Sequence, residues 1–160
     1  MLAHLFIGCA GYQLGPTNGR VAGDKSIQIN PFASKVMEPR LSEAVTSSIR
    51  KQLQQDGTFK LDTRDEGDII VTGTITQYYH AQLTFQPSDI ITPRDYGLSI
   101  TAKVTARERA SGKVILERDV VGRTTIRVGQ DLTSAERQAV PLASEDLARN
   151  ITSLLVDGEW

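Results

Sequence analysis

The chain has 160 residues, of which 39% are hydrophobic and 23% are charged, and this composition is typical of a single soluble globular domain. Its 18 basic and 19 acidic side chains nearly cancel, which argues against a broad nucleic-acid-binding surface because such surfaces need a strong positive field. One cysteine excludes an internal disulfide and any metal site built from several cysteines.

The N-terminal residues are expected to form a leader and a tether. Residues 1–8 are apolar except for His4, too short for a membrane span of about 20 residues, and resemble the end of a signal peptide. The run stops at Cys9, as at the lipidated cysteine of bacterial lipoproteins, and a buried structural thiol is the alternative. An aspartate after that cysteine often retains lipoproteins at the inner membrane, so Ala10 favours the outer one. Residues 9–25 are predicted to be a lipidated cysteine and a flexible, glycine-rich tether.

A strand and a helix are predicted next. Residues 26–30 alternate, with Ile27 and Ile29 on one face, and end at Pro31. The helix begins near Pro39 and ends at Asp56-Gly57, because glycine takes the left-handed capping conformation without strain. Its core side is formed by apolar residues three and four apart: Leu41, Ala44, Val45, Ile49 and Leu53.

Residues 61–68 are rich in acids, but Arg64 occupies a position where a calcium loop needs an oxygen ligand, so a turn is predicted. Residues 69–85 then alternate in one long strand, with threonines on the outer face. His80 falls on this polar face. The core side is predicted at the odd positions: Ile69, Val71, Gly73, Ile75, Gln77, Tyr79, Ala81, Leu83 and Phe85.

Residues 86–95 contain two prolines and are predicted to be the longest irregular loop of the domain. Residues 96–109 and 113–128 are predicted as two more strands of a meander, joined by a turn at 110–112. In the earlier strand the apolar side is predicted at Leu98, Ile100, Ala102, Val104 and Ala106. The charges at 117–119 indicate a twist, a bulge or an edge position.

A last helix is predicted to start near Ser134, because Thr133 and Glu136 have the spacing of a capping box. Its apolar side continues to Asp157-Gly158. Pro141 predicts a kink or a division into two shorter helices, since proline removes a backbone hydrogen bond.

Catalytic motifs are missing from the sequence. His80 is the one histidine beyond the apolar leader, and no nucleophile motif, phosphate loop or metal-binding motif accompanies it. A soluble enzyme that uses His80 and nearby acids is therefore the weaker hypothesis, and no metal or cofactor is expected.

Five segments in this order resemble the LptE family of outer-membrane lipoproteins that assist lipopolysaccharide assembly. They are CAGYQLG at 9–15, NPF at 30–32, LDTRDEGDIIVTGTIT at 61–76, DYGLSIT at 95–101 and ERASGKVILE at 108–117. The similarity extends from Cys9 to Leu155.

The resemblance implies an α+β, two-layer sandwich of residues 26–157, with two helices packed on one face of a mixed sheet of about four strands. The order of elements read from the residues, β-α-β-β-β-α, fits this fold independently. The resemblance also implies a non-enzymatic protein, anchored to the outer membrane of a Gram-negative bacterium and facing the periplasm, that plugs and supports the LptD β-barrel and binds lipopolysaccharide.

Binding of the anionic lipid needs Lys or Arg near a loop or a strand end. Arg94 is the first candidate, followed by Lys103, Arg107, Arg123 and Arg127; the alternative for each is an ordinary solvated charge. An alternative function is that of a periplasmic lipoprotein activator of cell-wall synthesis or a secretion-system accessory protein.

Overall fold

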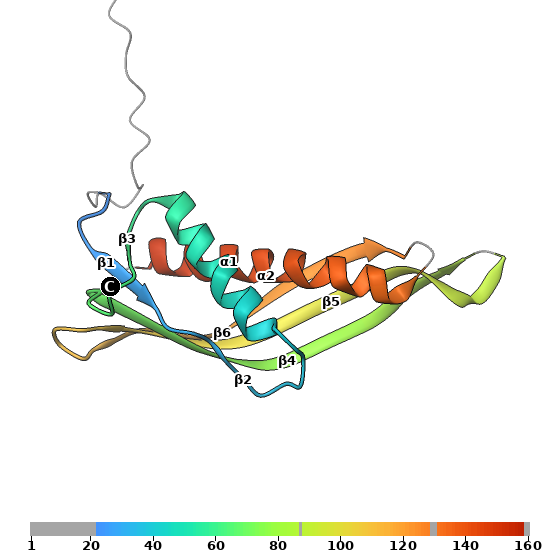
Figure 1. The fold of residues 1–160 in the computed structure, drawn as a ribbon, viewed down its shortest axis with the longest axis horizontal. Helices are drawn as coiled ribbons and strands as arrows, with labels where there is room; N and C mark the ends of the chain where they lie inside the picture. The colour runs from blue at the N-terminus through green and yellow to red at the C-terminus, as the bar shows by residue number, and fades with distance from the viewer. Residues whose placement is uncertain (1–21, 87, 129–130, 159–160) are drawn as a thin grey trace, which may run out of the picture.

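The computed structural model describes residues 22–86, 88–128 and 131–158, so the predicted leader and Cys9 lie outside the described residues. Two helices pack on one face of a single sheet (Figure 1), which confirms the predicted two-layer α+β fold. The elements in chain order are β1 (Ser26–Ile29), β2 (Ala33–Ser34), α1 (Leu41–Asp56), β3 (Lys60–Asp62), β4 (Ile69–Gln86), β5 (Asp89–Glu108), β6 (Val114–Arg127) and α2 (Leu132–Val156).

The sheet is mixed and has six strands, where about four were expected. Its order is β3-β1-β4-β5-β6, with the short β2 also paired to β4. The pairs of β1 with β3 and β4 and of β2 with β4 are parallel, whereas β4, β5 and β6 form the predicted antiparallel meander. The two extra strands, β2 and β3, have only two and three residues, too few for an alternating pattern to reveal them.

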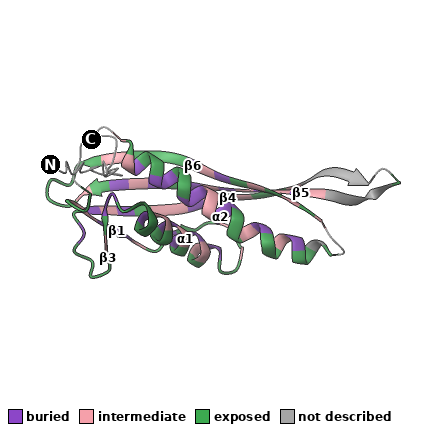
Figure 2. Ribbon diagram, turned by 90° about the horizontal axis from the view of Figure 1, so that it is seen from above, coloured by how far each residue is buried: buried purple, intermediate pink, exposed green. Residues whose placement is uncertain are grey.

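The core lies between the sheet and the two helices, as the buried residues in Figure 2 indicate. Burial of such side chains is the main stabilising term, about 1.5–3 kcal/mol for each large one. The strands contribute Ile27, Ile69, Val71, Ile75, Ile100 and Val104, and the helices contribute Leu41, Val45, Ile49, Leu53, Leu147, Ile151 and Leu155.

Helix α1 has the predicted core side and the predicted end. Gly57 has a φ of 75° and its N–H donates to the Leu53 carbonyl at 3.1 Å, the arrangement that favours glycine after a helix. The segment that connects β1 to α1 is held against the helix, because the Phe32 N–H donates to Thr46 Oγ1 at 3.0 Å.

Helix α2 differs from the prediction at its start and at Pro141. The N-cap is Asp131, whose carboxylate accepts the N–H groups of Thr133 and Ser134 at 3.1 and 3.0 Å, so the capping-box prediction was wrong. The helix also continues unbroken through Pro141, so of the two alternatives predicted there, the division into two shorter helices was wrong. Pro141 and Arg137, whose carbonyl loses its partner, are both exposed, and water can therefore replace the missing bond.

Strand β4 changes its orientation at a β-bulge between Ile75 and Gln77. An extra residue in one strand moves every later side chain to the opposite face. Odd positions therefore face the helices only as far as Ile75, and Tyr78 replaces Tyr79, which is 66% exposed. The predicted sides of Gln77, Tyr79 and His80 were wrong for this reason.

The predicted loop at residues 86–95 is mostly strand. Strand β4 extends to Gln86 and β5 begins at Asp89, and the pairing continues outward through Phe85 with Pro93. Register shifts at Thr84, Phe85 and Gln86 give the irregular pairing in which a proline is tolerated. The resulting β4–β5 hairpin extends beyond the helices (Figure 1).

Strand β6 is an edge strand, as its charges predicted. Part of its outer backbone is covered by α2 side chains: the Arg123 N–H donates to Asp146 Oδ2 at 2.9 Å, and Asn150 Nδ2 donates to the Val121 carbonyl at 2.8 Å. These bonds satisfy backbone groups that an uncovered edge would offer to another chain.

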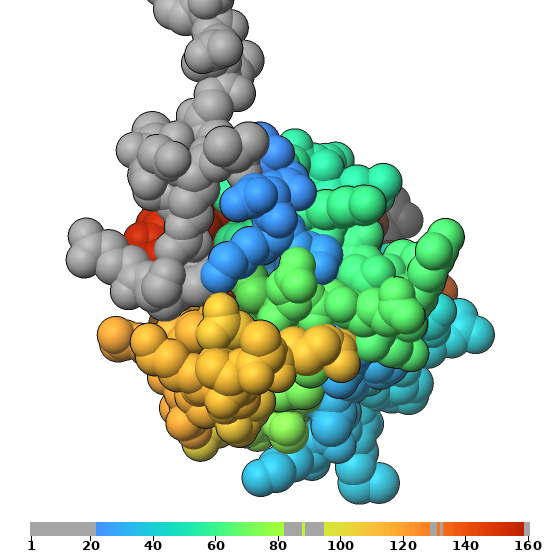
Figure 3. Space-filling model, turned by 90° about the vertical axis from the view of Figure 1, so that its left-hand side faces the viewer, coloured from blue at the N-terminus to red at the C-terminus, as the bar shows by residue number. Residues whose placement is uncertain are grey.

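The β5–β6 turn lies at the end of the molecule shown in Figure 3. Arg109, in this turn, connects it to the acid-rich turn before β4. Its guanidinium donates to the carbonyls of Gly67 and Asp65, both at 2.8 Å, and to Gln28 Oε1 at 2.6 Å. Asp68 accepts from the N–H and hydroxyl of Ser26 at 2.9 and 2.7 Å, and these bonds lower the pKa of its carboxyl. The acid-rich turn therefore joins β1 to the meander.

Candidate functional site

The face of the sheet opposite the helices, called here the free face, is the surface on which the predicted binding residues gather. Antiparallel partners point to the same side, so the pairings identify its members. These are mostly threonine, serine and charged residues, including Thr72, Thr74, Tyr79, Ala81, Gly97, Ser99, Thr101, Lys103, Thr105, Arg107, Glu117, Asp119, Arg123, Thr125 and Arg127.

Four of the five predicted cations, Lys103, Arg107, Arg123 and Arg127, lie on this face. Arg94 lies in the outer part of β5 beside Pro93, and its side chain is outside the described ones. The structure thus brings together cations that the sequence placed only on separate strands.

Three of these cations already have partners. Lys103 Nζ lies 2.7 Å from Glu117 Oε1, Arg107 Nη1 donates to the Gly112 carbonyl at 2.8 Å, and Arg127 Nε lies 3.9 Å from Asp95 Oδ1. The hydrogen bond and charge of Glu117 raise the pKa of Lys103, and the same bond lowers the pKa of Glu117. Among the described residues, the guanidinium of Arg123 has no hydrogen-bond or ion-pair partner.

A hollow of about 300 Å³ lies beside Arg123 and is called here the free-face hollow. Tyr79 and Arg123 stand at its two sides, on β4 and β6. In the neighbouring row, Gly97 of β5 lies between Ala81 and Thr125 and has no side chain to fill the space. The hollow is lined by Tyr79, Ala81, Gly97, Leu98, Ser99, Arg123, Thr124 and Thr125.

Neither Tyr79 nor Gly97 was predicted to be a site residue. The bulge that turns Tyr79 outward has no sequence signature of its own, so the alternation placed Tyr79 in the core. Gly97, inside an otherwise regular strand, was an available signal, because such a glycine often marks a place where a ligand or another backbone comes close.

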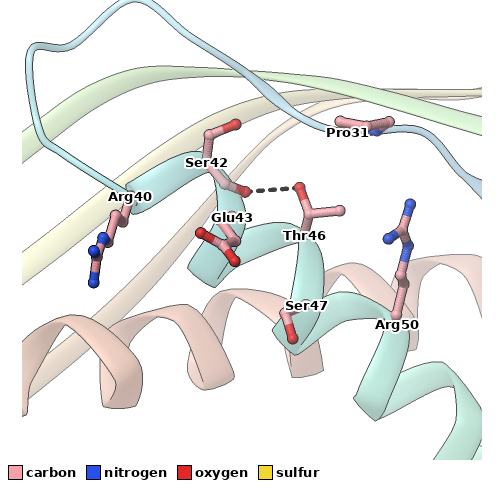
Figure 4. A pocket seen from close by; sticks show the side chains of 7 residues that line it. All are labelled: Pro31, Arg40, Ser42, Glu43, Thr46, Ser47 and Arg50. Atoms are coloured by element: carbon pink, nitrogen blue, oxygen red, sulfur yellow. Dashed lines mark hydrogen bonds between the residues drawn. The ribbon is translucent and has the colours of Figure 1, made fainter.

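A larger hollow of about 530 Å³ lies at the start of α1 (Figure 4) and includes Arg40, Glu43 and Arg50. Its polar groups are largely engaged in holding the connection before the helix. Thr46 Oγ1 donates to the Ser42 carbonyl at 2.7 Å, and Arg50 Nη2 donates to the Ile29 carbonyl at 2.7 Å. We therefore assign this hollow a mainly structural part.

His80 lies on the helix side of β4, in an aromatic cluster. Its ring stacks on Tyr96 with a centroid distance of 5.6 Å and meets the edge of Tyr78 at 6.1 Å. Tyr78 donates its hydroxyl to Glu136 on α2 at 3.0 Å. Burial, followed by Glu136, raises the pKa of Tyr96 to about 12 and also raises the pKa of Tyr78. The cluster attaches β4 to α2 through Tyr78, and His80, although exposed, contributes its ring to the cluster.

The described part of the chain shows neither a metal-binding cluster nor a membrane-spanning helix. Within these ranges, no three His, Cys, Asp or Glu side chains are grouped to hold a metal ion. No helix of this part of the chain is both long enough and apolar enough to span a membrane.

The fold and the site define a class: a small two-layer α+β domain in which one sheet face carries the core and the other is polar and open. The family model of LptE, described as lipopolysaccharide-assembly, matches residues 25–155. The chain belongs to the LptE family, and is thus an LptE-like lipoprotein. No curated protein matches it in sequence.

Solved structures support the fold alone. The minor lipoprotein from Acinetobacter baumannii is similar with a TM-score of 0.55 and 13% identity, over 83% of this chain and 93% of that chain. Protein XCC0632 from Xanthomonas campestris has a TM-score of 0.57 and 8% identity, over 83% of this chain and 84% of that one.

Proposed function

We propose that this protein is an outer-membrane lipoprotein that faces the periplasm, occupies and supports an LptD-type β-barrel, and assists the assembly of lipopolysaccharide. The observation that carries the proposal is the match of the LptE family over residues 25–155. The protein acts by binding its partners and not by catalysis.

The chemistry of the free face supports a place inside a barrel. The interior of a wide outer-membrane barrel is wet and polar, and a plug with an apolar outer face would not suit it. The strand residues that point away from the helices include Thr72, Thr74, Ser99, Thr101 and Thr105, whose hydroxyls can exchange hydrogen bonds with water or with barrel side chains.

The anchor is the lipidated Cys9. Labelling cells with radioactive palmitate tests it: the protein becomes labelled and fractionates with the outer membrane, and Cys9→Ala abolishes both. Label that remains in Cys9→Ala would remove the anchor from the proposal.

Lipopolysaccharide is the proposed ligand, and the cations of the free face are its proposed contacts. Lys103, Arg107, Arg123 and Arg127 share one surface with the strand hydroxyls, and Arg94 lies farther out on the same hairpin. Phosphate groups favour arginine because its planar fork donates two parallel hydrogen bonds.

Affinity purification of the full chain from its own envelope tests the partner. We expect an LptD-type barrel to co-purify in equal amount, and depletion of the chain to reduce folded barrel and surface lipopolysaccharide. Recovery of a cell-wall synthase or a secretin in its place, with normal lipopolysaccharide export after depletion, would contradict the proposal.

A further inference from the structure

The free-face hollow is built from two rows of residues that run across three strands. Tyr79, Ser99 and Arg123 are directly opposite one another on β4, β5 and β6. Neighbouring strands are about 4.8 Å apart, so the backbones of Tyr79 and Arg123 are separated by about 10 Å. A single sugar ring fits between two side chains at this spacing.

The second row supplies the room. Ala81, Gly97 and Thr125 are opposite one another. Glycine and alanine are the two smallest amino acids, so this row leaves space above the sheet. Glycine inside a strand weakens it, because it loses more conformational entropy than other residues and has no side chain to pack. Glycine at position 97 is explained if a ligand comes close to the backbone there, because a larger side chain would block it.

Tyr79 is the wall on the β4 side. It is 66% exposed, although the tyrosine beside it in the sequence, Tyr78, packs against the core. An exposed tyrosine offers an apolar ring face, on which the C–H groups of a sugar can stack, together with a hydroxyl that stays hydrated.

Arg123 is the wall on the β6 side. Its backbone is fixed from the covered face, because its N–H donates to Asp146 of α2 at 2.9 Å. Its guanidinium has no partner among the described residues, unlike those of Arg107 and Arg127 on the same face. An arginine whose backbone is held in place and whose guanidinium is unpaired is suited to bind a phosphate with two parallel hydrogen bonds.

The lining combines hydroxyl groups with apolar surface. Ser99 and Thr125 bring hydroxyls to the hollow, beside Ala81 and the ring of Tyr79, and this mixture suits a sugar ring, which has hydroxyls at its rim and C–H groups on its faces. A volume of about 300 Å³ holds one ring with its phosphate.

We propose that the free-face hollow binds one phosphorylated sugar of the polar head of lipopolysaccharide, with Tyr79 stacked on the ring and Arg123 bound to the phosphate. This inference rests on the proposed function, and it adds the chemical group recognised and Tyr79 as the residue that selects a sugar.

Binding is measured by NMR on the full chain with three probes: lipopolysaccharide micelles, glucosamine 6-phosphate and glucosamine. We expect the phosphorylated sugar to shift the amide signals of Gly97, Ser99 and Thr125, and glucosamine to shift them much less at equal concentration. Inorganic phosphate, added as a fourth probe, separates a sugar site from a simple anion site, and equal shifts with phosphate alone would overturn the sugar part.

Variants on this exposed face test the two walls. Tyr79→Ala should weaken binding of lipopolysaccharide about tenfold, as expected for loss of an aromatic contact, while Tyr79→Phe keeps the ring and most of the affinity. Arg123→Ala should weaken it about 10- to 100-fold, as expected for hydrogen bonds to a charged group. Lys51→Ala is the control, because Lys51 lies on α1, away from the free face, and is paired with Glu145 at 3.7 Å, and it should bind nearly as the native chain does.

Two results would overturn the inference in distinguishable ways. Native affinity in folded Tyr79→Ala and Arg123→Ala would exclude the hollow and leave lipopolysaccharide binding by the family function intact. Failure of the native chain to bind either lipopolysaccharide or the sugar phosphate would count against the lipid part of the proposed function, and the hollow would lose its ligand with it.

Discussion

The two faces of the β4–β5–β6 meander are made by the same strands but have different physical roles. Ile100 and Thr101 are neighbours in the chain, yet Ile100 is fully buried under the helices and Thr101 points to the free face. The covered face carries the hydrophobic free energy of folding, and the free face carries hydroxyls, charges and the hollow. Alternation along a strand therefore places residues that stabilise the fold next to residues that are open to a partner.

The largest expected effect comes from truncation on the covered face. Ile100→Ala should lower the free energy of unfolding by about 2–5 kcal/mol, since it removes buried methyl groups and leaves a cavity. Thr101→Ala should lower it by less than about 1 kcal/mol. Urea unfolding of the two variants measures both values, and equal losses would contradict the division between faces.

A matched pair of glycines gives the next largest effect. A Cβ on Gly122 would overlap the Ala143 carbonyl and Leu147 of α2, so Gly122→Ala should cost about 1–3 kcal/mol. Gly97 lies on the free face, and Gly97→Ala should change stability by less than about 0.5 kcal/mol but reduce binding of lipopolysaccharide. A stable Gly122→Ala protein would show that α2 is not held against β6 there.

A smaller effect is expected in alkali, from the aromatic cluster on the covered face. The pKa of Tyr96 is raised to about 12, while an unfolded tyrosine has a pKa of about 10. A raised pKa means that the neutral form is favoured by folding, so this stabilisation is complete below pH 10 and is lost as the pH rises from about 10 to 12.

Thermal unfolding across this pH range measures the effect. Tyr96→Phe should flatten the decline in stability, and Glu136→Gln should reduce it, because burial remains when the charge of Glu136 is removed. If the stability of the native chain did not decline between about pH 10 and 12, ionisation of Tyr96 would not be linked to unfolding in this range.

The smallest effect is expected from the ion pair between Lys103 and Glu117 on the free face. Both side chains are half exposed, and exposed pairs contribute little to stability. Lys103→Ala should leave the unfolding midpoint within error, but it should raise the pKa of Glu117, which the Lys103 hydrogen bond lowers. An NMR titration of the Glu117 carboxyl detects this shift. The same titration of the native chain at high salt is the control, because salt screens the attraction between exposed charges.

The regular elements could be predicted from the sequence because their signals are local. Gly57 ended α1 as expected, and the alternation of Leu98, Ile100, Ala102 and Val104 identified the covered side of β5. Strands β2 and β3 were missed because parallel pairing between distant short segments has no local pattern.

The site could be predicted only in part. Charge and position selected Arg123 among five cations, but the sequence could not show that the others on the free face are paired. Tyr79 was placed in the core because the bulge after Ile75 depends on pairing with β5. Asp131 was overlooked as the cap of α2 because Thr133 and Glu136 offered a competing local pattern.

We propose that the free face contacts the barrel and its lipid, while the helices support the sheet. Photo-crosslinking in living cells tests it most directly, with a benzoylphenylalanine at Thr101 on the free face or at Gln54, an exposed position of α1. We predict crosslinks from Thr101 to an LptD-type barrel and much weaker ones from Gln54. Strong crosslinks from Gln54 with none from Thr101 would contradict the account.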